Sequence, residues 1–235
     1  MTPSARIALL IATMPCVDAV RAMGDADPLL FKAVGKKIEI RKTSGHDHLA
    51  WDADLWVGYD INKLWFKFEG ENSEDRVEEA EFQALYSRAV TTNWDIQMGW
   101  RHDLRPKPER DWAAIGVRGI APYHFDVDLT AFIGSSGRTA ARIDLDYEII
   151  FTQRLVLTPE FEAEFYGKDD PALNIGSGLS QMEAGARLRY EIRREFAPYI
   201  GINWWSKFGD TKRFARATGD ETSDVELVLG LRIWF

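Results

Sequence analysis

The chain has 235 residues, a mean hydropathy of −0.28 and a formal net charge of −8 at pH 7. This acidic balance argues against nucleic acid as a partner, because phosphate binding requires a basic surface. The single cysteine, Cys16, excludes an intrachain disulfide and a zinc site built from cysteines. The modest hydropathy does not exclude a membrane barrel, because barrel strands alternate apolar and polar residues.

The amino-terminal segment has some features of an export signal. Arg6 precedes an apolar run that ends at Met14, and small residues follow this run. A basic start before an apolar stretch is typical of secretory signals, although the cleavage motif here is weak. We expect residues 1–27 to be a weak signal-like or disordered segment and residues 28–235 to form an outer-membrane β-barrel domain.

From about residue 30 onward, the apolar residues recur at every second position. Phe125, Val127 and Leu129 alternate with polar residues, for example, and the same alternation runs to the last residue, Phe235. A period of two predicts strands with one apolar face rather than helices. We expect twelve strands, at residues 30–41, 49–60, 63–70, 78–88, 94–104, 110–121, 124–134, 139–151, 155–167, 179–192, 196–207 and 223–235.

The predicted connections are of two kinds that alternate along the chain. Those at Ile61-Asn62 and Pro122-Tyr123 are short, whereas those at Pro171 to Gly178 and Gly209 to Ser223 are long and polar. Short turns at one end and longer loops at the other are typical of outer-membrane barrels with both termini periplasmic. The predicted fold is therefore all-β: a transmembrane antiparallel up-and-down β-barrel of about 12 strands.

A soluble barrel or sandwich would show the same alternation. The placement of aromatic residues and the end of the chain favour the membrane barrel, because aromatic belts mark bilayer interfaces. The chain closes with Ile233-Trp234-Phe235, which looks like the carboxy-terminal signature of outer-membrane barrels. The expected belts are Trp51, Trp100, Phe165 and Trp204 near the long loops, and Tyr59, Trp94, Phe125, Phe151 and Tyr190 near the short turns.

If the apolar row faces lipid, the charged row faces the lumen. The predicted lumen is net negative, which favours cations over anions. Acids and arginines inside a barrel can also pair across strands and plug it, and the sequence leaves both interpretations open. The predicted inward acids are Asp52, Asp54, Glu69, Glu81, Asp95, Asp126, Asp128, Asp144, Asp146, Glu148, Glu160, Glu162, Glu164 and Glu183, facing Lys67, Arg101, Arg118, Arg142, Arg187, Arg189 and Arg232.

Three segments carry a resemblance to a known family: Trp56 to Trp65, Arg189 to Gly201 and Gly230 to Phe235. They resemble the copper resistance protein B family, and the likeness runs from Pro28 to the end of the chain. The resemblance implies an outer-membrane protein of copper resistance, with membrane lipids and copper ions as partners, and it allows for a periplasmic copper protein as a further partner.

Two groups of residues are candidate copper contacts. His46, Asp47 and His48 lie in the first long loop, where two imidazoles and a carboxylate could meet a Cu(II) ion. A solvated polar loop is the alternative for this group.

His124 begins a predicted strand at the short-turn end and is expected to point inward with Asp126 and Asp128. These residues could form an ion-entry ring, and a histidine that simply pairs with an aspartate is the alternative.

The favoured function is copper resistance or homeostasis, in which the barrel binds copper ions or passes them through an acidic lumen. The alternative is a general small-cation pore, or a structural barrel without copper preference. An enzyme would need a nucleophile with a base and an orienting group. No serine is placed by parity and depth to pair with one of the four histidines, so we expect no catalytic activity.

Overall fold

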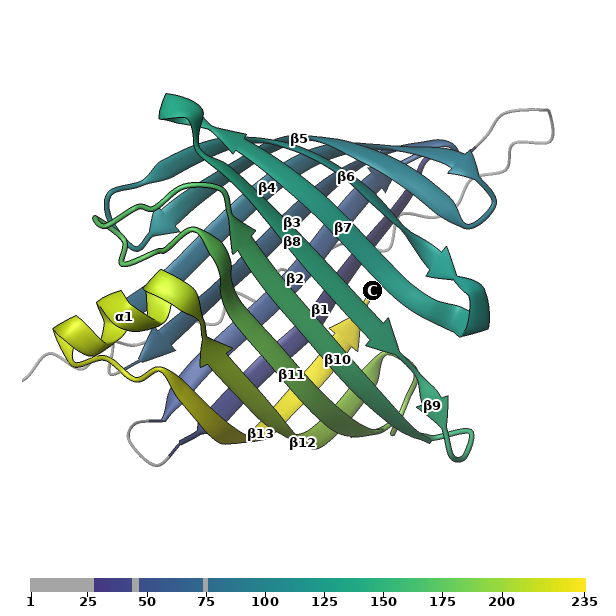
Figure 1. Cartoon of the computed structure of the whole chain (residues 1–235). Helices are drawn as coiled ribbons and strands as arrows, with labels where there is room; N and C mark the ends of the chain where they lie inside the picture. The colour runs from purple at the N-terminus through teal and green to yellow at the C-terminus, as the bar shows by residue number, and fades with distance from the viewer. Residues whose placement is uncertain (1–27, 44–46, 74–75) are drawn as a thin grey trace, which may run out of the picture.

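The computed structural model describes residues 28–43, 47–73 and 76–235. Its strands form one closed antiparallel barrel with steeply tilted strands (Figure 1). The strands are β1 Leu30–Lys42, β2 His48–Gly58, β3 Asn62–Ser73, β4 Arg76–Thr91, β5 Trp94–Arg105, β6 Arg110–Ala121, β7 Phe125–Gly134, β8 Thr139–Tyr147, β9 Ile149–Ile150, β10 Leu155–Tyr166, β11 Gly178–Tyr190, β12 Phe196–Lys207 and β13 Ser223–Trp234.

Consecutive strands are paired, except that β8 and β9 both pair with β10, and β13 pairs with β1 to close the barrel. The short β9 continues β8 beyond an interruption at Glu148, because both pair antiparallel with β10. The thirteen named strands therefore amount to twelve spanning strands, as predicted. The two ends of the barrel domain meet: the Ala33 amide donates to the Phe235 carbonyl over 3.0 Å.

The alternation of faces is confirmed along most strands. On β13, Val225, Leu227 and Leu229 are all at least 60% exposed, whereas Glu226 between them is 1% exposed. One row thus projects outward and the other lies inside the barrel. Most of the predicted aromatic belt is also exposed: Tyr59, Trp100, Phe125, Phe151, Phe165, Tyr190 and Trp204.

Three local elements differ from the predicted pattern. β3 and β4 form a longer hairpin, because their ladder continues through polar pairs such as Glu71 and Glu79, which show no apolar alternation. The connection after β12 contains a helix, α1 (Gly209–Thr218), which ends at Gly219 in the left-handed conformation. Short 3-10 turns, η1 (Pro122–His124) and η2 (Ser135–Gly137), join the strands on either side of β7.

No helix in the described ranges is long and apolar enough to span a membrane.

The described part of the lumen contains an apolar cluster as well as charges. Leu85, Trp112 and Phe132 point inward from three strands and are 5% exposed or less. The Arg101 guanidinium lies over the Phe132 ring, 4.6 Å from its centroid. This cation–π contact joins the apolar cluster to the charged side chains of the lumen.

Candidate functional site

The strands place an unusually charged set of side chains inside the barrel. Glu39, Arg187 and Glu226 are each 4% exposed or less, although ionised groups are rarely buried so fully without partners. Alternation explains their position, because the apolar neighbours of each occupy the opposite face. The partners of these charges determine what the lumen can do.

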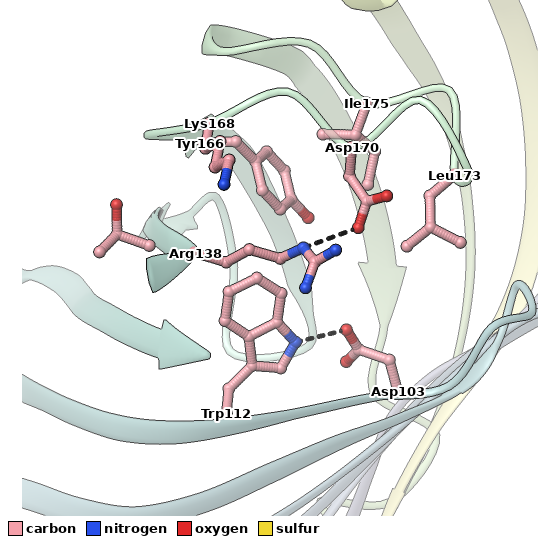
Figure 2. Close-up of a pocket in the computed structure, with 9 residues that line it drawn as sticks. Asp103, Trp112, Arg138, Tyr166, Lys168, Asp170, Leu173 and Ile175 are labelled. Atoms are coloured by element: carbon pink, nitrogen blue, oxygen red, sulfur yellow. Dashed lines mark hydrogen bonds and ion pairs between the residues drawn. The ribbon is translucent and has the colours of Figure 1, made fainter. Parts of the chain in front are cut away.

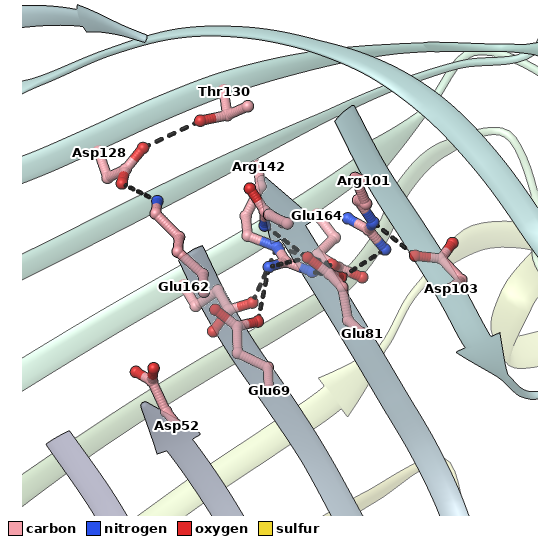
Figure 3. Close-up of polar contacts among 12 residues, drawn as sticks. Asp52, Glu69, Glu81, Arg101, Asp103, Asp128, Thr130, Arg142, Glu162 and Glu164 are labelled. Carbon is pink, nitrogen blue, oxygen red and sulfur yellow. Dashed lines mark hydrogen bonds and ion pairs between the residues drawn. The ribbon is translucent and has the colours of Figure 1, made fainter. Parts of the chain in front are cut away.

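The centre of the lumen is crossed by ion pairs between strands that are not neighbours in the sheet. The Lys67 Nζ of β3 lies 2.7 Å from the Asp128 Oδ2 of β7. Arg142 of β8 reaches Glu69 at 2.8 Å and Glu81 at 2.9 Å, on the far side of the barrel (Figure 3). These contacts tie opposite walls together.

Arg142 is the most heavily engaged of these basic groups. Besides its two far-wall partners, it contacts Glu164 at 2.8 Å and Glu162 at 3.5 Å on the neighbouring strand β10. Arg101 extends the network, with Glu81 at 2.7 Å and Asp103 at 2.6 Å. A guanidinium shared by four carboxylates cannot neutralise them all, so negative charge remains around it.

Acids also stand directly opposite one another on adjacent strands. Asp128 pairs in register with Asp144, Asp144 with Glu162, and Glu162 with Glu183, from β7 to β11. Like charges in this position repel unless a cation or a proton intervenes. We call these four residues the acid ladder. Its member Asp144 makes no ion pair within 4.0 Å in the described part of the chain, whereas Lys67, Arg101, Arg142 and Arg187 each make at least one. The lumen is thus both crossed by salt bridges and net acidic.

The first candidate group is divided by the structure. His46 lies outside the described residues. Asp47 is exposed, and its Oδ2 lies 3.5 Å from the Lys42 ammonium. His48 instead points into the lumen, where its Nε2 lies 3.1 Å from Glu71 and 3.3 Å from Glu226. Asp47 and His48 therefore lie in different environments and do not form one site.

The second candidate group is spread over different environments. His124 is exposed in the turn η1 with a φ of 68°, and it precedes β7 rather than beginning it. The prediction that His124 begins a strand is wrong, because this left-handed residue still belongs to the turn. Asp126 is exposed, whereas Asp128 is buried and accepts hydrogen bonds from Lys67 and Thr130.

Within the described ranges, no three or more His, Cys, Asp or Glu side chains are arranged as a preformed metal site. Sequence reasoning missed Glu39, Arg41, Glu71 and Glu226 as lumen residues. The signal for most of them was present, because Ile38 and Ile40 alternate with Glu39 and Arg41, and Glu226 lies between two outward residues. Glu71 was missed because the predicted strand ended one residue earlier.

The connection between β10 and β11, residues 167–177, is held against the barrel by ion pairs. Its Asp170 is 6% exposed and forms ion pairs with Arg110 at 2.9 Å and with Arg138 at 3.0 Å. Figure 2 shows the pair of Arg138 and Asp170 above Trp112. The Ser177 amide donates to Asp169 over 2.6 Å, and this hydrogen bond holds the pKa of Asp169 below its usual value. This loop forms a small recess around Trp112 and Tyr166 at the long-loop end.

A closed twelve-strand barrel with an apolar outer row and a charged interior defines an outer-membrane β-barrel. The chain belongs to the copper resistance protein B family, because the family model described as "Copper resistance protein B precursor (CopB)" matches residues 29–235. The resemblance seen in the sequence is thereby confirmed.

Curated relatives agree with this family. The chain is 45% identical over 202 residues to a "Copper resistance protein B homolog" of Pseudomonas syringae pv. tomato, covering 86% of this chain and 69% of that protein. It is 41% identical over 199 residues to "Copper resistance protein B" of Escherichia coli, covering 85% and 67% of the two chains.

Solved structures with a similar fold include two porins. The NanC porin superposes with a TM-score of 0.58 at 12% identity, covering 87% of this chain and 99% of that chain. The KdgM porin gives a TM-score of 0.51 at 11% identity, covering 88% and 99%. At this identity the likeness concerns the fold alone.

Proposed function

We propose that this barrel acts in copper resistance by binding copper ions in its acidic lumen or passing them through it. The observation that carries the proposal is the acid ladder inside a member of the copper resistance protein B family. A divalent cation lowers the repulsion between these acids, and carboxylate oxygens together with imidazole nitrogens are suitable donors for Cu(II).

The salt bridges support a stepwise path for a copper ion in this proposal. A cation that enters the lumen competes with Lys67 and Arg142 for the same carboxylates. Passage would therefore occur by exchange between successive carboxylates, with basic side chains displaced in turn, and weak binding at several positions favours release. The proposal includes no catalytic step.

The short-turn end holds both ends of the barrel domain, and we propose that it faces the periplasm, as the pattern of loops favours. A periplasmic copper protein would then meet the barrel at this end. The candidate contacts His124 and Asp126 lie there and are exposed to such a partner.

A second candidate function is a structural or general cation barrel without copper preference. The ion pairs between opposite walls favour it, because such pairs brace a lumen without requiring any ligand. Metal selectivity distinguishes the two functions.

The test is uptake of Cu(II), Zn(II) and Na⁺ into liposomes that contain the purified full chain. The double variant Asp144→Asn/Glu162→Gln replaces two carboxyl groups of the acid ladder with amides. It should slow copper uptake on the order of tenfold, because a loss of about 1.4 kcal/mol of charge attraction corresponds to a factor of ten. A matched control, Glu195→Gln/Glu221→Gln, removes two exposed charges outside the lumen and should leave uptake unchanged. Equal uptake of all three cations would favour the general barrel.

A further inference from the structure

We infer that His48, Glu71 and Glu226 form a binding site for a borderline divalent cation, Cu(II) or Zn(II), at the long-loop end of the lumen. The inference rests on the proposed function and deepens it, because it assigns one position along the lumen where an imidazole joins the carboxylates.

The three side chains converge from three strands. His48 begins β2, Glu71 lies near the end of β3, and Glu226 lies near the start of β13. β1 alone separates β13 from β2 in the sheet, so all three residues occupy one side of the lumen mouth. The His48 Nε2 lies 3.1 Å from the Glu71 Oε1 and 3.3 Å from the Glu226 Oε1.

The imidazole nitrogen is buried and lacks a hydrogen bond. The His48 side chain is 10% exposed and that of Glu226 is 1% exposed. The Nε2 atom has no hydrogen-bond partner in the described structure, although two carboxylate oxygens face it. The nitrogen thus lies between two carboxylates that repel each other, and either a proton on the imidazole or a cation shared with the two oxygens relieves that repulsion.

The distances between the imidazole nitrogen and the two carboxylate oxygens are compatible with one shared metal ion after a small movement of the side chains. Donors about 2.0–2.2 Å from one metal ion, at angles of roughly 90–110°, are about 2.8–3.6 Å apart. Both nitrogen–oxygen distances fall in this range. Glu71 has the freedom to close onto an ion, because its side chain is 29% exposed and its described ion pair is with His48.

Glu226 is held in place by its own neighbours. The Trp205 Nε1 donates to Oε1 over 2.9 Å, and the Asn203 Nδ2 donates to Oε2 over 3.1 Å. Asn203 is itself 1% exposed. Such outer partners orient a ligating carboxylate and are typical of metal sites.

Arg41 is the group that opposes a cation here, since its Nη1 lies 3.6 Å from the Glu226 Oε2. It is also bound to Glu39 at 3.0 Å and to Glu183 at 3.1 Å, so its charge is shared. The connected network keeps a net charge of −2 while His48 is neutral, because it contains five acids and three basic groups: Glu39, Glu71, Glu160, Glu183 and Glu226 against Lys37, Arg41 and Arg187.

The donor set identifies the class of ion. One nitrogen and two carboxylate oxygens suit Cu(II) and Zn(II), whereas Mg²⁺ and Ca²⁺ prefer oxygen alone. Binding should therefore survive an excess of Mg²⁺.

The test is a Cu(II) titration of the full chain, folded in detergent, followed by electron paramagnetic resonance in the presence of Mg²⁺. We expect a signal with nitrogen hyperfine coupling that is lost in His48→Gln. Glu71→Gln should weaken binding by about tenfold or more, since loss of even an outer-shell partner costs about 10–100-fold. Circular dichroism and heat-dependent gel migration establish that each variant folds.

His102→Gln is the matched control, because that imidazole lies at the long-loop end but pairs with Asp111 at 2.8 Å. A nitrogen signal that persists in His48→Gln, or that disappears in His102→Gln, overturns the inference. Loss of the signal in His48→Gln alone supports it.

Liposome uptake separates this inference from the proposed function. Copper-selective uptake by a barrel that shows no His48-dependent signal would refute the site and leave the function standing. A His48-dependent signal in a barrel without copper preference would establish the site and refute the function.

Discussion

At the scale of the residue, the stability of the barrel depends less on how many buried ion pairs the lumen has than on each pair having both its members. Lys67 and Asp128 are 6% and 9% exposed, and each is the other's ion-pair partner across the barrel. Removal of one member leaves a buried charge without compensation, which costs far more than the pair contributes.

We therefore expect Lys67→Met to destabilise the barrel by about 3–5 kcal/mol. The double variant Lys67→Met/Asp128→Leu should recover most of this loss, because it leaves no unpaired charge. Urea unfolding of the refolded protein in detergent gives both free energies. A single variant as stable as the parent chain would show that water already solvates this pair.

The hydrogen bond from the Ser177 amide to Asp169 gives a second prediction, this one on pH. The pKa of Asp169 is lowered in the folded protein, so the contribution of this contact is fully present above the usual aspartate value of about 3.9 and is lost as the pH falls through the lowered pKa. Exchange of the Ser177 amide with solvent should accelerate over that window. In Asp169→Asn the exchange should show no such step, beyond the intrinsic pH dependence of amide exchange.

At the scale of the element, the loop between β10 and β11 is an ordered structure that the barrel holds by a few contacts. Asp170 binds Arg110 of β6 and Arg138 beside η2, and the Gly176 amide donates to Thr211 of α1 over 2.8 Å. Asp170→Asn should weaken both arginine contacts without disturbing the strand ladder.

We expect limited proteolysis to cleave Asp170→Asn in this loop several times faster than the parent chain, since local opening depends on the few contacts that hold the segment. The midpoint of global unfolding should stay within about 0.5 kcal/mol of the parent value. Asp220→Asn, in the exposed connection after α1, serves as the control. Equal cleavage rates would mean that the loop is held by its packing alone.

The elements also show which features of the fold a sequence reveals. Strands that cross the bilayer were predictable, because lipid on one side and a polar lumen on the other enforce a period of two. α1 was not, because its burial rests on two small residues, Thr211 and Ala215, in an otherwise polar helix. The extension of β3 to Ser73 was not predictable either, because strand segments beyond the bilayer need no apolar face.

The candidate site was less predictable than the fold. Parity alone indicates that Glu226 faces inward, yet the convergence of His48, Glu71 and Glu226 depends on the closure of β13 onto β1. Nothing local in the sequence reports which residues face each other across a closed barrel. The grouping of His48 with Asp47 followed from their adjacency, and adjacent strand residues point to opposite faces.

At the scale of the whole molecule, a barrel in a membrane inverts the usual arrangement: the apolar row covers the outside and the charges fill the inside. The outer row is continuous around the barrel, and Leu129 of β7 is one of its members, with 39% exposure. Its neighbour Thr130 lies inside at 7% exposure, and buried and exposed residues alternate strictly from Asp128 to Ile133 of β7.

Leu129→Arg tests this arrangement directly. A charge on the lipid face costs about 2–4 kcal/mol near the bilayer midplane and about 0–1 kcal/mol near the interface. Leu129 lies in the middle of its strand, so we expect Leu129→Arg to block stable insertion into lipid vesicles. The matched variant Leu49→Arg places the same charge on an exposed leucine one residue after the start of β2, near the interface, and should insert almost normally. Heat-dependent gel migration after refolding into vesicles measures the inserted fraction. Normal insertion of Leu129→Arg would show that this face of β7 does not meet lipid, and the depth difference between the two variants reports the thickness of the apolar band.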